Sequence, residues 1–123
     1  MAKIPVVYVA GPYRGDISLN IDRAKAVGML AAQLGWSPVI PHANTAHFDT
    51  MLPEISDEFW LEATLEIMRR CDAVVLVPGW ESSIGAVGEK KEAERLLMPV
   101  FDNISNLPQA MDFLESLNHA CFD

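Results

Sequence analysis

Short apolar runs alternate with segments of helical periodicity along this chain, and the alternation constrains the fold more than any other feature. Four runs have the composition of buried strands: Ile4–Ala10, Trp36–Ile40, Asp72–Val77 and Met98–Phe101. Helical spacing predicts helices over about residues 20–34 and 56–70, from near Ser83 onward, and over about residues 108–117. Strands that alternate with helices predict a parallel sheet with right-handed crossovers. We therefore predict an α/β domain, a three-layer Rossmann or flavodoxin-like fold with a parallel sheet of four to five strands and helices on both faces.

The size and composition of the chain predict a single domain over residues 1–123. With 123 residues, 50% of them apolar, the chain can bury a core without disulfides or metals. Cys71 and Cys121 lack the spacing of a metal or redox motif, so we expect reduced thiols and a cytoplasmic location. No apolar run approaches the ~20 residues that span a bilayer, so we expect no membrane association.

The charge balance bears on the choice of partner. Seventeen acidic residues against nine basic residues give a formal charge of −8, and no basic run is present. A protein that follows a phosphate backbone needs clustered Lys and Arg side chains. We therefore expect no nucleic-acid polymer as a partner, and a small molecule is the better expectation.

Two loops are predicted to face each other across one crevice. In the flavodoxin-like strand order the first and third strands are neighbours, so the loops after Ala10 and after Val77 open at the same edge of the sheet. The first loop, Gly11–Gly15, has two glycines that permit positive φ and close backbone approach, and Arg14 adds donors for an anion such as phosphate. Taken alone, this loop is equally well interpreted as an ordinary β–α turn. The segment Pro41–Pro53, which shows no period, is predicted to be a long loop.

The second loop leads to a carboxylate at the start of a helix. Its sequence is Ser83-Ile84-Gly85-Ala86-Val87-Gly88-Glu89. Ser83 is interpreted either as a helix N-cap or as a phosphate ligand, and one hydroxyl can fill both roles. Gly85 and Gly88 each disfavour a helix by about 1 kcal/mol relative to Ala, which suggests that they expose the carboxylate. The helix dipole is expected to lower the pKa of Glu89 and to keep it ionised, as a nucleophile toward a sugar carbon requires.

The segment from Ser83 to Glu89 is one of two motifs, and the other is Tyr8-Val9-Ala10-Gly11-Pro12-Tyr13-Arg14-Gly15. Together the two motifs resemble the nucleoside 2-deoxyribosyltransferase superfamily, particularly its 2′-deoxynucleoside 5′-monophosphate N-glycosidase branch. The resemblance covers about residues 4 to 101 and marks the chain as a divergent member. It implies that Glu89 attacks C1′ of the sugar and that Tyr8 makes a hydrogen bond beside it. It also implies a 5′-phosphate site formed by Gly11, Pro12, Tyr13, Arg14, Gly15, His42, Ser83 and Gly85. Taken alone, His42 is more simply interpreted as a histidine of a surface loop.

Three further expectations follow from the same resemblance. Relatives carry a sugar-binding Asp eight residues before the strand aspartate, a position that Thr64 occupies here. Trp80, in the Pro78–Glu81 insert, is expected either to stack on the base or to contact a second subunit. The resemblance also implies a homodimer or higher homo-oligomer in which Ser105 or Asn106 reaches the neighbour's phosphate site, with no metal or other cofactor.

The function implied is hydrolysis of an N-glycosidic bond, or deoxyribosyl transfer, on a nucleoside or nucleoside 5′-monophosphate. The mechanism is double displacement through a glycosyl ester of Glu89, with retention at the sugar carbon. Glu81 is close in sequence to the site and is a candidate for the acid that protonates the leaving base. Two alternatives stay open: a non-catalytic nucleotide-binding or sensing module, which Thr64 favours, and a structural or partner-binding domain whose crevice holds no perturbed carboxylate.

Overall fold

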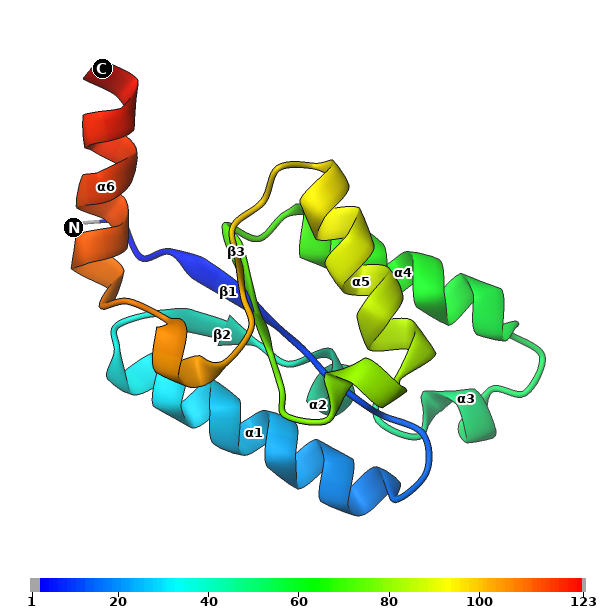
Figure 1. Cartoon of the computed structure of the whole chain (residues 1–123). Helices are drawn as coiled ribbons and strands as arrows, with labels where there is room; N and C mark the ends of the chain where they lie inside the picture. The colour runs from blue at the N-terminus through cyan, green and yellow to red at the C-terminus, as the bar shows by residue number, and fades with distance from the viewer. Residues whose placement is uncertain (1–2, 123) are drawn as a thin grey trace.

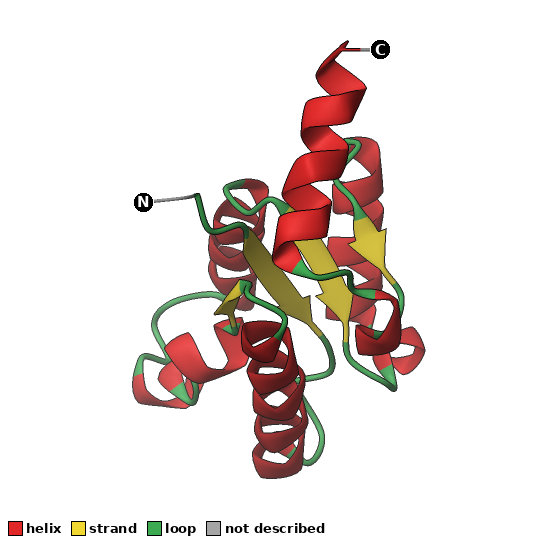
Figure 2. Cartoon of the chain, turned by 90° about the vertical axis from the view of Figure 1, so that its left-hand side faces the viewer, coloured by secondary structure: helices red, strands yellow, loops and turns green. Residues whose placement is uncertain are grey.

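The computed structural model describes residues 3–122 and shows an α/β domain in which helices cover both faces of a parallel sheet (Figures 1 and 2). The strands are β1 (Val6–Ala10), β2 (Ser37–Val39), β3 (Ala73–Leu76) and β4 (Val100–Phe101). Their order is β2-β1-β3-β4, and all neighbours are parallel. The larger helices are α1 (Ile17–Gln33), α4 (Asp57–Arg69), α5 (Ile84–Arg95) and α6 (Ala110–Phe122). The predicted fold class is confirmed, as is the pairing of the first and third strands.

Alternation of side chains along β1 divides the core into two layers. Val7 and Val9 pack on the face covered by α1 and the first turns of α6. Tyr8 and Ala10 point to the opposite face, where α4 and α5 lie. β1 and β3 are each fully buried over their last four residues because both faces of the sheet are covered.

Helix capping explains where the observed boundaries differ from the predicted ones. α1 starts three residues before the predicted Asn20 because the Asp16 carboxylate accepts a hydrogen bond from the Leu19 backbone N–H at 3.1 Å. Ser56 caps α4 in the same way, through the Phe59 backbone N–H at 3.1 Å. At the other end of the chain, α6 runs to Phe122 rather than to the predicted Leu117.

The prediction of a loop without secondary structure over residues 41–53 is wrong. Two one-turn helices occupy it, α2 (Pro41–Asn44) and α3 (Phe48–Met51). Pro41 starts α2 because its fixed φ suits the first helical position. His47 precedes α3 in the left-handed conformation, with φ of 65°. Helices of four residues are too short to show a hydrophobic period, so the sequence pattern did not reveal them.

Two further expectations from the sequence concern the cysteines and membrane-spanning helices. Cys71 is a free, partly buried thiol, whereas the side chain of Cys121 lies outside the described residues. Within residues 3–122, no helix combines the length and the apolar character that crossing a membrane requires.

Gly11 is required where β1 ends against β3. A Cβ atom added at Gly11 would lie 2.6 Å from Cβ of Val77, which follows β3 and is itself buried. We expect Gly11→Ala to lower the free energy of unfolding by about 1–3 kcal/mol because the backbones would have to separate. Urea denaturation measures this change. Gly88→Ala is the control, since a Cβ there meets nothing within 4 Å, and an equal effect at both glycines would contradict the steric explanation.

Candidate active site

A cleft of about 910 Å³ opens at the carboxyl ends of β1 and β3. Its walls come from the loop after β1, from α2, α3 and α4, and from the first turns of α5. It brings together most of the residues that the sequence singled out: Tyr8, Gly11, Pro12, Tyr13, Arg14, His42, Thr64, Ser83, Gly85 and Glu89. Two predicted residues, Gly15 and Trp80, do not line it.

Tyr8 and Glu89 form a hydrogen-bonded pair in the floor of this cleft. Tyr8 lies on β1 and is completely buried, and its phenolic O–H donates to the Glu89 carboxylate. Glu89 lies in the second turn of α5 and is half-buried, 81 residues away along the chain. The pairing follows from the period of β1, because the side chains that point away from α1 point toward α5.

Burial raises the pKa of Glu89 to about 7, and the hydrogen bond from Tyr8 opposes this shift only in part. The predicted lowering of this pKa is therefore wrong. A helix N-terminus stabilises a charge by about 0.3–1 kcal/mol, less than loss of water costs a carboxylate at this site. Burial also raises the pKa of Tyr8, and the neighbouring Glu89 raises it further, so the phenol keeps its proton and remains a donor.

Thr64 lies beside this pair. Its hydroxyl donates to the Leu61 carbonyl oxygen, one turn earlier on α4, at 2.9 Å. The nearby Thr64 side chain lowers the pKa of the Tyr8 phenol, against the larger effects of burial and of Glu89, which raise it. The position that holds a carboxylate in the resembling enzymes therefore supplies a neutral hydroxyl to Tyr8 here.

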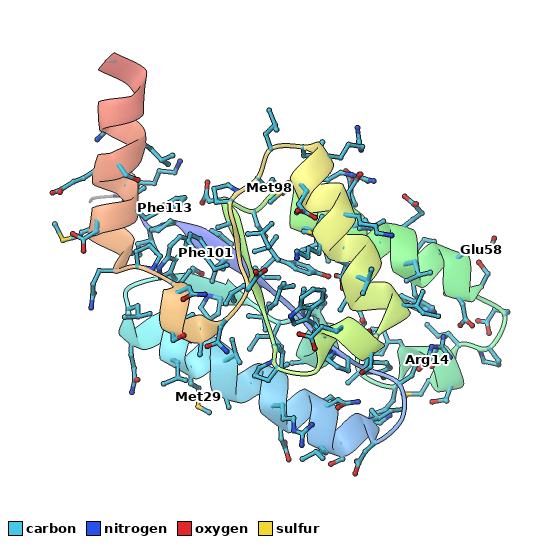
Figure 3. The ribbon with its side chains drawn as sticks, in the orientation of Figure 1. Arg14, Met29, Glu58, Met98, Phe101 and Phe113 are labelled. Atoms are coloured by element: carbon cyan, nitrogen blue, oxygen red, sulfur yellow. The ribbon has the colours of Figure 1, made fainter. Side chains whose placement is uncertain are left out.

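The loop after β1 is held in shape from within. Gly15 has φ of 98°, in the left-handed region that favours glycine. The Asn20 side-chain amide donates to the carbonyl oxygens of Tyr13 and Arg14 at 3.1 and 3.0 Å. Figure 3 shows Arg14 in the region of α3, and its guanidinium pairs with the Asp57 carboxylate at 3.1 Å. The fork of donors predicted for an anion is thus engaged with a carboxylate of the protein.

His42 is a buried residue of α2, which excludes its interpretation as a surface-loop histidine. Its Nε2 lies 2.9 Å from the Gly11 carbonyl oxygen and 2.8 Å from that of Pro12, so Nε2 carries the proton and donates to the loop. Burial lowers the pKa of His42 and keeps the ring neutral. His42 therefore positions the loop, and its Nδ1 is buried without a partner among the described residues.

Trp80 and Glu81 lie outside the cleft. The Trp80 ring packs against the core layer that contains Tyr8 and Met68, and the Lys90 ammonium lies 4.5 Å from its centroid. Glu81 and Lys91 line an adjoining pocket of about 300 Å³, which shares Ser82, Ser83, Ile84 and Gly88 with the cleft. The structure therefore places neither Trp80 nor Glu81 in the lining of the cleft that contains Glu89.

Trp60 also lines the cleft, and the sequence analysis did not single it out. It lies on α4, one turn before Thr64, so both residues are on the same side of the helix. Phe48 and Phe59 pack edge-on against its ring, with centroids 6.0 and 5.2 Å away. The spacing of four residues from Thr64 was the one available signal for Trp60.

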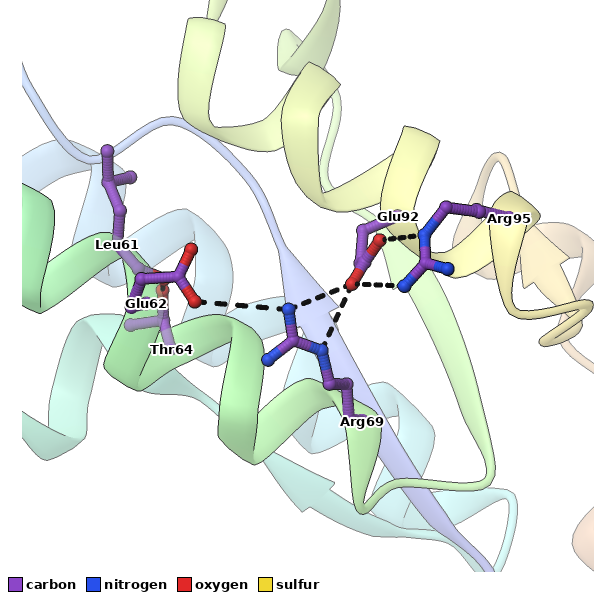
Figure 4. Close-up of polar contacts among 6 residues, drawn as sticks. All are labelled: Leu61, Glu62, Thr64, Arg69, Glu92 and Arg95. Carbon is purple, nitrogen blue, oxygen red and sulfur yellow. Dashed lines mark hydrogen bonds and ion pairs between the residues drawn. The ribbon is translucent and has the colours of Figure 1, made fainter.

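Ion pairs fasten α4 to α5 behind the cleft (Figure 4). Nε and Nη2 of Arg69 donate to the Glu92 carboxylate at 3.0 and 2.9 Å, and Nε of Arg95 donates to it at 2.6 Å. Hydrogen bonds from Arg95 and Arg69 lower the pKa of Glu92 to about 2. The pairs hold the helix that carries Thr64 against the helix that carries Glu89.

Comparison with known proteins adds one finding. A family model described as a domain of unknown function (DUF7768) matches residues 5–103, which include every residue that lines the cleft. The curated proteins gave no match to the chain.

Proposed function

The chain belongs to the DUF7768 family, described as a domain of unknown function, and we propose that it cleaves the N-glycosidic bond of a nucleoside or nucleoside 5′-monophosphate. The observation that supports this most is the desolvated Glu89 carboxyl, hydrogen-bonded to buried Tyr8 at the floor of a large cleft. Carboxyl groups with strongly shifted pKa values in clefts are characteristic of active sites. The reaction class, cleavage of an N-glycosidic bond, is proposed because the two loop motifs resemble those of the nucleoside 2-deoxyribosyltransferase superfamily.

The proposed reaction is a double displacement. A Glu89 carboxylate oxygen forms a bond to C1′ of the sugar while the bond from C1′ to the base nitrogen breaks and the base leaves with that electron pair. Water, or an N–H group of a second base, then attacks C1′ and the bond from C1′ to the Glu89 oxygen breaks. The attacking group loses one proton, which balances the proton that the departed base takes up from solvent, and the configuration at C1′ is retained. Tyr8 orients the carboxylate through its O–H. Attack neutralises the buried charge, so the desolvation that raises the pKa of Glu89 also favours the step.

A homodimer with its active sites near the subunit contact belongs to the same proposal, as does a location in the cytoplasm. Two apolar residues of the cleft wall, Ile84 and Leu61, are 94% and 52% exposed. Burying them against a second copy would remove apolar surface from water. Sedimentation velocity tests the dimer, and a monomer at micromolar concentration would refute it.

A non-catalytic nucleotide-binding module is the second candidate. The neutral Thr64 favours it, since the cleft then lacks a carboxylate at the position used by the resembling enzymes. The shifted pKa of Glu89 argues against a purely structural domain, for which a perturbed carboxyl group in a cleft has no use.

Base release tests the proposal directly. Purified protein would be incubated with ribo- and 2′-deoxynucleosides and with their 5′-monophosphates, and free base would be followed by chromatography. Mass spectrometry of the quenched reaction would show a sugar adduct on the peptide that contains Glu89. No release from any substrate, together with binding seen by thermal shift, would favour the binding module.

The pH dependence of the reaction follows from the environment of Glu89. Only the ionised carboxylate attacks, so kcat/KM is expected to rise with pH and to level off above a midpoint near 7. An ordinary, exposed Glu would place this midpoint near 4.5. Initial rates between pH 4.5 and 9 measure it, and a flat profile over that range would show that Glu89 is not the titrating group.

Gly88 offers a test that separates catalysis from folding. It lines the cleft, and a Cβ added there meets nothing within 4 Å. Gly88→Leu is expected to raise the free energy of unfolding by up to about 1 kcal/mol, because glycine disfavours a helix. The same side chain would extend into the cleft and lower kcat/KM about a hundredfold. Gly88→Ala is the matched control, with the gain in stability and a smaller loss of activity.

A further inference from the structure

We infer that the cleft selects a nucleoside without a 5′-phosphate, an inference that rests on the proposed function and narrows its substrate class. The resemblance points to a nucleoside 5′-monophosphate instead. The two substrates differ by a group that carries about two negative charges at neutral pH. The charges and donors of the cleft therefore decide between them.

The lining of the cleft is acidic. Among the described residues that line it, Arg14 is the one Lys or Arg. Four lining residues carry carboxyl groups: Asp49, Asp57, Glu62 and Glu89. Arg14 is paired with Asp57 at 3.1 Å, and Glu62 has a long contact with Arg69 at 3.9 Å. Lys91 is not among these residues; it lines the adjoining pocket, together with Glu81. A phosphate entering the cleft would thus meet an excess of negative charge.

Two other polar side chains of the cleft donate to carbonyl oxygens of the protein itself, and the Ser83 hydroxyl serves as a helix cap. His42 is neutral, and its Nε2–H donates to the Gly11 and Pro12 carbonyl oxygens. The Ser82 hydroxyl donates to the Gly79 carbonyl oxygen at 2.9 Å. The Ser83 hydroxyl oxygen accepts from the Ala86 backbone N–H at 3.2 Å, which occupies an amide at the N-terminus of α5. That helix N-terminus still favours negative charge, but its reach is limited to the first turn.

A neutral nucleoside suits the same lining. Its hydroxyl groups are donors, and the carboxylates of the cleft are acceptors. Its base presents a flat apolar surface, and the cleft supplies Trp60, Leu61 and Leu65. The cleft therefore offers partners for each part of a nucleoside and repulsion for a phosphate.

The test compares one nucleoside with its own 5′-monophosphate, both by base release and by calorimetric binding. At 50 mM salt we expect the nucleoside to be favoured at least about tenfold in kcat/KM and in Kd, since like charges at close range oppose binding strongly. At 500 mM salt the preference is expected to shrink severalfold, because ions screen the repulsion. An equal or better response to the monophosphate at low salt would overturn the inference.

Matched variants identify the origin of the preference. Asp57→Asn removes one charge and frees Arg14, so the ratio of monophosphate to nucleoside kcat/KM is expected to rise about tenfold. Glu58→Gln is the control, because Glu58 is the next residue of the same helix turn, is exposed and does not line the cleft (Figure 3). An unchanged ratio in Asp57→Asn would overturn the electrostatic explanation.

The two proposals fail in different ways. Absence of base release from every substrate would refute the proposed function, while calorimetry would still compare nucleoside and monophosphate binding. Release that is faster from the monophosphate would support the proposed function and refute this inference. Weaker binding of the nucleoside than of the monophosphate would refute the inference whether or not turnover occurs.

Discussion

Replacing Glu89 with Gln is expected to lower base release by a factor on the order of a thousand or more, because the amide oxygen does not form the sugar ester. Gln has nearly the same size and still accepts the hydrogen bond from Tyr8, so the fold and the cleft should persist. Chromatography of free base measures the loss, and calorimetry with a nucleoside checks that binding survives.

Glu94→Gln is the matched control for this loss. Glu94 lies on the same helix, is exposed and does not line the cleft, so its variant should retain the full rate. A Glu89→Gln protein with more than a tenth of the wild-type rate would refute the role of nucleophile. A sugar adduct on another peptide would refute it as well.

The same substitution is expected to remove the contribution of Glu89 to the pH dependence of stability. Glu89 has a pKa of about 7 in the folded protein, against 4.5 for an ordinary Glu. Between these values the native state keeps a proton that the unfolded state has lost, so the free energy of unfolding falls as pH rises through this window. The change amounts to about 3 kcal/mol between pH 4 and pH 8. Gln does not titrate, so the variant should lack this fall.

Urea denaturation at a series of pH values measures the effect. At pH 8 the Glu89→Gln protein should be more stable than wild type by about 1–3 kcal/mol, whereas at pH 4 the two should differ little. Glu94→Gln should follow the wild-type curve. Parallel curves for wild type and Glu89→Gln would show that Glu89 is not desolvated in the native state. A variant that is more stable and less active would be typical of an active-site residue.

Prediction from sequence succeeded where the signal is local and repeated. The alternation of strands and helices predicted the sheet, and the neighbouring positions of β1 and β3 predicted that the loops after them would open onto one crevice. It failed for α2 and α3, whose four residues are shorter than a hydrophobic period. It also indicated Trp80 and not Trp60, because tertiary packing decides which side of a helix faces a cleft.

The sequence by itself determined the α/β class, the parallel sheet and the two loop motifs, since each depends on residue types at fixed spacing along the chain. Only the tertiary structure decided the state of Glu89, the pairing of Arg14 with Asp57 and the burial of His42. The physical reason is that desolvation and charge pairing depend on atoms from distant segments. Tyr8, on β1, lies 81 residues before Glu89 along the chain and forms a hydrogen bond with it in the folded protein. Burial of the Glu89 carboxyl group, rather than the nearby helix dipole, controls its pKa.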